Sequence, residues 1–382
     1  MKKFMFLIIV LILITQVFGI SEFACIFINS NPSARGTAFG NNSGTADIWD
    51  TSPLGVWSNP AKLSYHENAA IGFTRVPWYK DSFDDYYLTS SYVSFKWKNF
   101  GILLPAPSEK KRWGTVMSYG QQVILDEDGN YIGSFDNYES CSKIAVGFNV
   151  ADLLSNFTNN GDEQQYYDIS IGFNLDIIKS GNYPSSIIGA KGSGNSLSTG
   201  IGLLGEISPL NNSNASDGLY RLDFTAGMYL INPFKSEIKY ENESQSDPLP
   251  WGIHPAFSGK LSILKDADSN LNLESLIVNN IVSLYMSCDY ALYGNYSKDN
   301  SGELAFGGEI SLLDILFIRK GWYKENYSDN VEGKIGFGIN CNYKKIVQFQ
   351  YNFAQFTREW NKQKRNDFLL RIDFIKAYGL FL

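Results

Sequence analysis

His66 and His254 are the two histidines of the sequence, and histidine is the side chain that most often serves as a general acid or base near neutral pH. Neither stands in a His-Glu-x-x-His zinc pattern, and the sequence contains no Gly-x-Ser-x-Gly nucleophile motif. A hydrolase built on strands would need a histidine in register with a serine or aspartate, and nothing around these two positions requires that arrangement. The sequence therefore predicts no enzyme activity and no cofactor.

Two acidic segments look like the start of a calcium-binding loop without completing it. In Asp126–Asn130 the glycine comes too early, and in Asp266–Asn270 the glycine position is occupied by another residue. Neither segment has a glutamate at the twelfth position, which normally supplies two calcium ligands. Polar hairpin loops explain both segments better, and Asp128 followed by Gly129 is a typical hairpin-turn signal. We therefore predict no metal site.

The four cysteines are widely separated along the chain. They are Cys25, Cys141, Cys288 and Cys341, and no two of them form a Cys-x-x-Cys pair. Zinc binding and thioredoxin-type exchange are therefore not expected. An exported protein could pair cysteines in disulfides, but we expect most of these to be lone apolar side chains.

One charged pair can be argued from strand register. A tight turn centred on Asp314 would place Glu309 directly opposite Arg319, with Phe306 opposite Trp322 on the other, apolar face. Glu309 and Arg319 would then share the polar face, where a charge that is partly removed from water needs a partner. The pair is either a structural strut, which we favour, or part of a ligand or gating site.

Alternation of apolar and polar residues dominates the chain after residue 68. In residues 167–177 the odd positions are apolar and the even ones are polar or glycine, and residues 335–343 and 347–353 repeat this pattern. A soluble sandwich would alternate in the same way, but these segments run to ten residues or more, against about 5–6 for ordinary strands. Together with polar faces of Gly, Asn, Gln and Ser, this length favours a membrane barrel whose apolar side chains face lipid.

The barrel interpretation assigns faces to individual residues. Gln348, Gln350 and Asn352 should point into the lumen, and Cys341 should face lipid unpaired. The residues expected to face lipid are Phe337, Ile339, Phe349, Tyr351, Phe353 and Phe374. We also expect the long connections, such as 208–218, 239–250 and 295–302, to lie at one end of the barrel and the short ones, such as 96–101, 179–182 and 312–315, at the other.

The first residues predict export. Residues 1–19 have two lysines, an apolar run, and Val17 and Gly19 at the −3 and −1 positions of a cleavage site, as a secretory signal peptide does. A lipoprotein cut before Cys25 is disfavoured because Glu22 stands where such a site needs an apolar residue. The net charge of −7 and the absence of a basic cluster argue against a nucleic-acid partner.

A short helix start precedes the first predicted strand. In Asn59-Pro60-Ala61, the asparagine can cap free amides and the proline fits the first turn of a helix. Almost nothing after this point has a helical pattern, so a capped helix here needs an explanation within a β protein.

Several segments resemble a known family of outer-membrane proteins. The stretch "SARGTAFG" at 33–40, followed by "NPAKL" at 59–63 and the first strand, is similar to the front of FadL/PorV-type barrels. Residues 307–323 and 332–356 resemble the late strands of the PorV/PorQ branch, with a Gly-x-Glu strand, a short turn, an Arg-x-Gly strand and a Gly-x-Gly hairpin in that order. Residues 100–250 match only in strand rhythm, and the stretch just before Asn59 departs from the small-residue run usual in the family.

The resemblance implies the fold class and the domain organisation. We expect an all-β protein with a signal peptide at 1–19, a plug at 20–67 inside the lumen, and a closed antiparallel transmembrane β-barrel of about 14 strands at 68–382. The alternative for the front segment is a periplasmic tail with an incidental Asn-Pro turn. In the plug, Arg35 would pair with a lumen carboxylate such as Glu309 or Asp176.

Three functions are compatible with these features. The first is a PorV/PorQ-type role linked to type IX-like secretion, with secreted proteins or other secretion components as partners. The second is a FadL-like channel for hydrophobic small molecules, which would have an apolar pocket in the lumen beside the plug. The third is a structural outer-membrane protein. All three place the chain in the bacterial outer membrane with its lipid as a neighbour.

Overall fold

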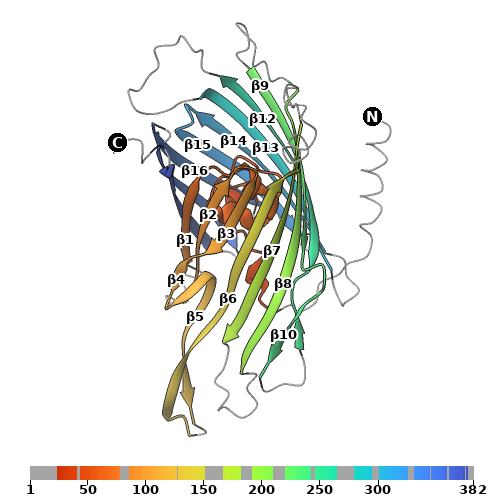
Figure 1. Cartoon of the computed structure of the whole chain (residues 1–382). Coiled ribbons are helices and arrows are strands. Elements are labelled where there is room, and N and C mark those ends of the chain that lie inside the picture. The colour runs from red at the N-terminus through yellow and green to blue at the C-terminus, as the bar shows by residue number, and fades with distance from the viewer. Residues whose placement is uncertain are drawn as a thin grey trace.

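The computed structural model is a closed ring of antiparallel strands (Figure 1), completed by pairing of β1 (Ala69–Pro77) with β18 (Asn361–Ile372). The description covers residues 24–40, 44–77, 86–126, 128–150, 167–181, 192–209, 220–241, 246–264, 279–294, 301–325, 331–344, 346–358, 361–374 and 376. The predicted signal peptide, the acidic segment Asp266–Asn270 and the end of the chain after residue 376 lie outside these residues.

Between β1 and β18 the wall is built from consecutive strands. They are β2 (Tyr86–Trp97), β3 (Phe100–Pro105), β4 (Pro107–Glu109), β5 (Arg112–Leu125), β6 (Tyr131–Asn149), β7 (Tyr167–Gly181), β8 (Ser193–Ile207), β9 (Tyr220–Ile231), β10 (Glu237–Tyr240), β11 (Ser246–Pro248), β12 (Gly252–Leu264), β13 (Asn280–Tyr293), β14 (Ser301–Leu312), β15 (Leu316–Glu325), β16 (Val331–Tyr343) and β17 (Val347–Arg358).

One wall position is shared by two strands. Residues 92–97 of β2 pair with β3, whereas residues 86–91 of β2 pair with β5, and β6 pairs with both. After β3 the chain leaves the wall through β4. It then re-enters the wall as β5, which runs along β2 in the same direction as β3. Strands β10 and β11 form an excursion of the chain between β9 and β12, in which β10 pairs with β11 and with residues 194–195 of β8. With β3 and β5 counted as one position, and β4, β10 and β11 set aside, the described wall has 14 positions, which confirms the predicted closed antiparallel barrel.

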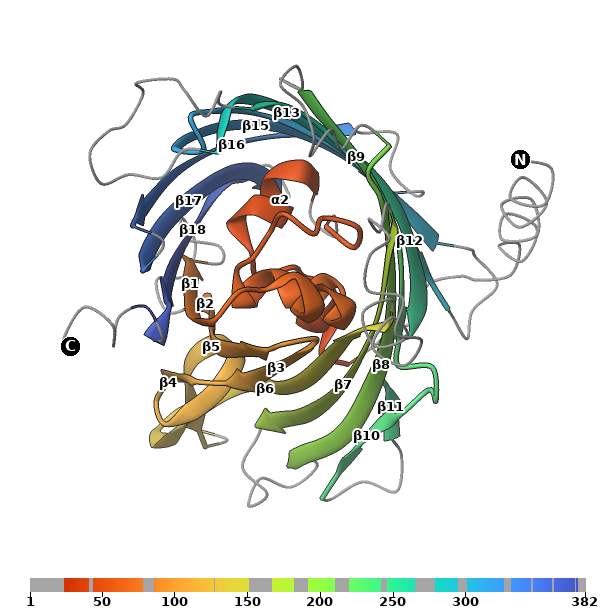
Figure 2. The same ribbon diagram turned by 45° about the horizontal axis from the view of Figure 1, so that its top comes forward.

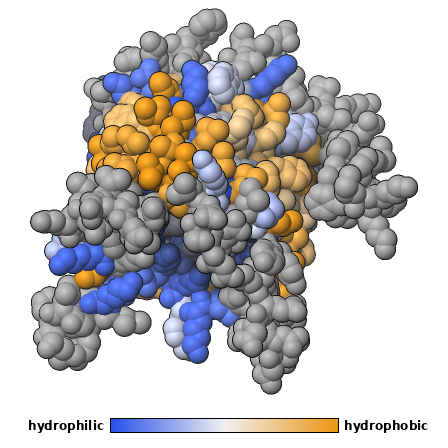
Figure 3. All heavy atoms as spheres, turned by 90° about the horizontal axis from the view of Figure 1, so that it is seen from above, coloured by the Kyte–Doolittle hydropathy of each residue, from blue (hydrophilic) through white to orange (hydrophobic). Residues whose placement is uncertain are grey.

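The alternation along the strands gives the barrel an apolar outer surface. Ile318 on β15 is 67% exposed and Phe349 on β17 is 46% exposed, while their polar neighbours Arg319 and Gln348 are buried. In the space-filling view, hydrophobic residues gather across much of the described surface (Figure 3). A closed wall without edges and with an apolar exterior is the form in which strands cross a bilayer. No helix among the described residues is long and apolar enough to span a membrane.

The two ends of the barrel can be told apart by their turns. At one end, which we call the turn end, lie the start of β1 and the turns at Lys98–Asn99 and Leu313–Ile315. At the other, the hairpin end, lie the β5–β6 hairpin and the β10–β11 excursion. Asp126 accepts the Gly129 amide there at 3.0 Å, so this acidic segment is a hairpin turn as predicted.

The predicted separation of long and short connections is wrong. The long connection after Ile207 starts at the turn end. The end of β8 is joined to the end of β14 at Leu312 by the successive pairings of β9, β12 and β13, and Leu312 lies at the turn end. Residues 179–181, expected in a short connection, belong to β7. The end at which a connection lies depends on the direction of the strand before it and not on the length of the connection. Long and short connections therefore occur at both ends.

Among the described residues, four short helices precede the wall: η1 (Ile26–Asn29), α2 (Ala34–Gly40), η2 (Pro53–Ser58) and η3 (Pro60–Tyr65). Asn59 begins η3, and its side chain accepts the amide of Ala61 at 3.0 Å, with Pro60 in the first turn. Ser52 caps η2 in the same way through the amide of Leu54 at 3.2 Å. The capped helix predicted at Asn59 is therefore present, as a short 3-10 helix.

Candidate functional site

The described residues 24–66, which we call the inner segment, lie inside the ring of strands (Figure 2). Helix α2 packs against β14 to β18, and η3 packs against β6, β7 and β8. These are opposite parts of the wall, so the segment crosses the lumen between them. Almost all of its described side chains are buried, the charged ones included.

A row of glycines makes room for η3. Gly101, Gly147, Gly172 and Gly202 are directly opposite one another on β3, β6, β7 and β8. A Cβ atom added at Gly172 would stand 2.2 Å from the amide nitrogen of Ala61, closer than any real contact. The backbone of η3 therefore lies directly on the backbone of the wall, which only glycine permits.

Helix α2 has a second glycine seat on the opposite wall. Gly307 and Gly321 pair across β14 and β15, and a Cβ at either one would collide with Phe39. A Cβ at Gly336 on β16 would stand 2.6 Å from the Cβ of Ala38. The alternating glycines of the strands thus match the two ends of the inner segment.

Arg35 of α2 joins the inner segment to the wall electrostatically. Its Nε–H donates to Asp47 at 2.7 Å, and another of its nitrogens donates to Glu309 at 2.5 Å. The same Glu309 oxygen accepts Nε–H of Arg319 at 2.6 Å, so two guanidinium groups share one carboxylate. Burial by itself lowers the pKa of Arg35, but the two carboxylates raise it well above its usual value and keep the group charged.

The network continues to the start of α2. Arg319 donates to the side-chain oxygen of Asn352 at 2.8 Å, and Asn352 donates to Asp367 at 2.8 Å. Asp367 accepts the amide of Ala34 at 2.6 Å, at the positive end of the helix. Glu309 of β14 and Asp367 of β18 therefore bind α2 directly, and Arg319 and Asn352 connect these two carboxylates through the wall.

A second buried charge pair lies beside Trp57 of η2. Lys143 on β6 is 3.0 Å from the carboxylate of Asp176 on β7 and donates to the hydroxyl of Tyr229 at 3.2 Å. Its ammonium also lies 4.8 Å from the ring centre of Trp57 of the inner segment. Asp176, one of the two carboxylates predicted for Arg35, is thus occupied by Lys143, and Arg35 pairs with the other, Glu309.

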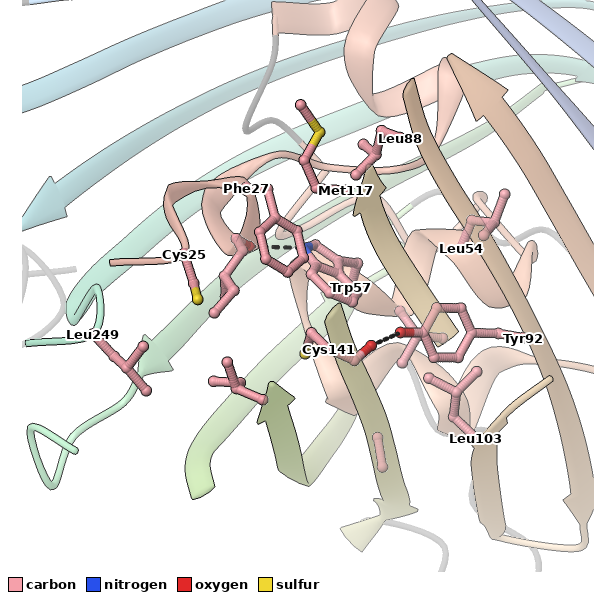
Figure 4. Close-up of a cluster of buried hydrophobic side chains, with 14 of the residues drawn as sticks. Cys25, Phe27, Leu54, Trp57, Leu88, Tyr92, Leu103, Met117, Cys141 and Leu249 are labelled. Atoms are coloured by element: carbon pink, nitrogen blue, oxygen red, sulfur yellow. Dashed lines mark hydrogen bonds between the residues drawn. The ribbon is translucent and has the colours of Figure 1, made fainter. Parts of the chain in front are cut away.

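The inner wall is unexpectedly apolar towards the hairpin end. Several apolar side chains point inward there from positions that the alternation assigns to the polar face; they include Leu88, Tyr92, Leu103, Met117, Cys141 and Ile178. We call this group the inner apolar patch. Phe27, Leu54 and Trp57 of the inner segment cover it (Figure 4). The sequence analysis missed this patch, although Ile178, on the same face as Asp176 and Ser180, was a signal for it.

The turn end is hollow and polar. A cavity of about 990 Å³ opens there, lined mainly by charged and amide side chains. Of the residues predicted to face the lumen, Arg35, Glu309, Gln348 and Gln350 line this cavity. Arg319 and Asn352 lie behind it, in the buried network described above.

The two histidines lie on the inner side in separate places. His66 Nδ1 is 3.1 Å from the hydroxyl of Ser94, whereas His254 lies between the rings of Tyr229 and Tyr293. Among the described residues, no hydrogen bond joins either histidine to a carboxylate. In the described part of the chain, no three His, Cys, Asp or Glu side chains come together as metal ligands.

No protein-family model matches the sequence, and no curated protein matches it significantly. Among solved structures, it is similar to the toluene transporter TbuX of Ralstonia pickettii, at 10% identity, a TM-score of 0.38, and coverage of 91% of this chain and 99% of that one. It is also similar to the toluene transporter TodX of Pseudomonas putida (11%, 0.32, 93% and 98%) and to a FadL homologue of Pseudomonas aeruginosa (9%, 0.34, 93% and 98%). Similarity at these identities and TM-scores does not indicate which molecule this chain binds.

Proposed function

We propose that this protein is an outer-membrane channel for hydrophobic small molecules, in which the inner segment is a plug that moves to open the path. The inner apolar patch supports this proposal above all. A pore for polar solutes has no use for an apolar inner wall, because water does not wet such a surface well. An apolar permeant, by contrast, gains free energy in proportion to the apolar area that it covers.

The contacts of the inner segment favour a plug of which only one part moves. Helix α2 and η3 rest on glycine seats. Helix α2 is also tied to the wall by the buried pair of Arg35 with Glu309, and η3 by hydrogen bonds of Asn59 to the Leu203 carbonyl at 3.1 Å and of Ser64 to Ser170 at 2.7 Å. The part over the inner apolar patch, η1, has no glycine seat among the described residues and is held by hydrogen bonds: Trp57 Nε1–H donates to the Ile28 carbonyl at 2.9 Å, the Ala24 amide donates to the Pro248 carbonyl at 3.1 Å, and Cys25 donates to Glu139. We place the opening at η1, where an apolar molecule can replace apolar plug residues.

Uptake by intact cells tests the proposal. Cells with a lipopolysaccharide outer leaflet, which slows apolar solutes, should take up radiolabelled toluene faster when they produce the chain. Leu103→Asn puts an amide into the inner apolar patch and should lower the initial rate several-fold, because that amide must be desolvated when the molecule passes. Leu103→Met is the matched control and should keep the rate. Equal uptake with and without the chain would refute the channel.

A secretion-linked role is the other function that the sequence resemblance implies, and no contact among the described residues favours it. It predicts a different result in the native host. Deleting the gene would leave toluene uptake unchanged and would prevent exported proteins from reaching the cell surface. A structural role predicts neither effect.

A further inference from the structure

A small cavity separates η1 from the wall near the hairpin end. It has a volume of about 20 Å³ and lies between Asn29 and Trp57 on the inner segment and Tyr229, Ile231 and His254 on β9 and β12. That space is enough for one group of the size of a water molecule. It lies beside Trp57, which also covers the inner apolar patch.

Two buried polar atoms at this cavity have no hydrogen-bond partner among the described residues. They are Nε2 of His254, a side chain that is 4% exposed, and the side-chain oxygen of Asn29. They come from the wall and from the inner segment, so they approach the cavity from opposite sides. Buried polar atoms are rarely left unpaired, because each costs free energy unless something satisfies it.

The rest of the lining is uncharged, and its polar side chains are already bonded: the Ser58 hydroxyl donates to the Gly55 carbonyl at 2.8 Å, and the Asn31 side-chain oxygen accepts the Ser33 amide at 2.9 Å. The indole nitrogen of Trp57 is already used by the Ile28 carbonyl. The hydroxyl of Tyr229 accepts from Lys143 and donates to Asn174 at 3.0 Å. Lys143, the nearest cation at Trp57, is paired with Asp176. The cavity therefore offers two free polar atoms and no free charge.

These two atoms define the kind of group that fits. The oxygen of Asn29 only accepts, so it needs a donor, whereas a neutral imidazole nitrogen either donates or accepts. A hydroxyl group supplies both roles at once and is no larger than a water molecule. A carboxylate would find no cation, and a methyl group would leave both atoms unpaired.

We propose that His254 and Asn29 form a hydroxyl-recognition subsite of the channel, which selects uncharged apolar molecules that carry one hydroxyl group. The hydroxyl lies in the cavity between the two side chains, and the apolar body takes the place of the Ile28 side chain, which lines the same cavity, while Asn29 stays opposite His254. This inference rests on the proposed function, because it names the class of molecule that the channel prefers.

Phenol and toluene are a matched pair of probes, since they differ in a hydroxyl against a methyl of similar size. Titration calorimetry on the full chain in detergent micelles should show phenol binding at least tenfold more tightly than toluene, a difference of about 1.4 kcal/mol. His254→Phe keeps an aromatic ring but removes the polar nitrogen, and should reduce phenol affinity to that of toluene. His254→Asn restores a donor and should recover part of the preference.

A second variant guards against a folding defect. Asn29→Leu changes the inner segment instead of the wall and should cause the same loss of preference. Equal affinities in the unaltered chain, a preference that survives both variants, or binding of neither probe by a chain that takes up toluene in cells would overturn the subsite. The proposed function fails separately, if cells that make the chain take up neither molecule faster.

Discussion

The carboxylate of Glu309 is shared by Arg35 of the inner segment and Arg319 of the wall, and all three side chains are at most 5% exposed. Glu309→Gln would leave two buried guanidinium groups with less compensation. We expect it to lower the free energy of unfolding by about 3 kcal/mol, as for other buried pairs that lose one partner. Urea unfolding in lipid vesicles, followed by gel mobility of the folded form, measures this.

An exposed ion pair on the same chain is the control for this prediction. Lys110, in the turn between β4 and β5, and Asp136 on β6 are 2.8 Å apart with side chains 51% and 39% exposed. Asp136→Asn should cost less than about 1 kcal/mol, because water screens the pair. Similar losses for the two variants would contradict the assignment of Glu309 as the buried tie of the inner segment.

His66 carries a pH dependence of stability. The pKa of His66 is lowered to about 3, first by burial and then by the nearby charges of Lys62, Arg371 and Lys96. The unfolded chain takes up a proton near pH 6.5, whereas the folded one does so only near pH 3. The free energy of unfolding therefore falls as the pH drops through this range, by at most about 1.4 kcal/mol per pH unit.

His66→Asn removes this contribution and leaves other titrating groups in place. Unfolding measured at pH 7, 6, 5 and 4 should show the advantage of the unaltered chain over the variant shrinking below pH 6.5. Parallel pH curves for the two proteins would show that His66 is protonated as readily in the folded as in the unfolded chain.

At the scale of elements, the fit between η3 and the glycine row decides whether the lumen is closed. Gly172→Val adds a side chain where a Cβ would already be 2.2 Å from the Ala61 backbone. Neither backbone can yield, so η3 must leave its seat. We expect planar bilayers to show a larger ion conductance for this variant than for the unaltered chain, because a barrel of 14 positions is too wide to be filled by its own side chains.

Gly205→Val on β8 controls for the substitution itself. The nearest atom to a Cβ at Gly205 is 3.9 Å away, an ordinary contact, so conductance should not change. If Gly172→Val conducts like the unaltered chain, or if the unaltered chain already conducts steadily, the inner segment does not close the pore.

At the scale of the whole molecule, the outer surface should behave as a lipid-facing one. Cys288 and Cys341 are exposed on the outer face of the wall, while Cys25 and Cys141 are buried inside. In vesicles, a lipid-soluble maleimide should label the two outer thiols, and a charged thiosulfonate should label neither, because it does not enter the bilayer. All four cysteines of the sequence should react after denaturation.

Gln350→Cys provides the opposite case, since Gln350 lines the polar cavity at the turn end. Its thiol should react with the charged reagent from the aqueous side. Labelling of Cys341 by the charged reagent at the same rate would show that the apolar face points to water, as in a soluble sandwich.

Much of the wall was predictable because each strand carries its own pattern. Alternation in residues 335–343 and 347–353 distinguished the two faces, and the turn at Asp314 set Glu309 opposite Arg319, as the structure has it. The capped helix at Asn59 was likewise predictable from its own side chain. The ends at which the connections fall were not predicted correctly, because they depend on counting every strand without error.

Thus the sequence by itself determined local features: which residues form strands, which face of each is apolar, and where the short helix begins. Only the tertiary structure decided what lies inside. Gly101, Gly147, Gly172 and Gly202 look like ordinary polar-face positions until register aligns them beneath η3. Asn29 and His254 come together only when the inner segment enters the barrel. The physical reason is that alternation is a property of neighbouring residues, whereas these contacts join segments that are far apart in the chain, and closure of the ring sets their positions.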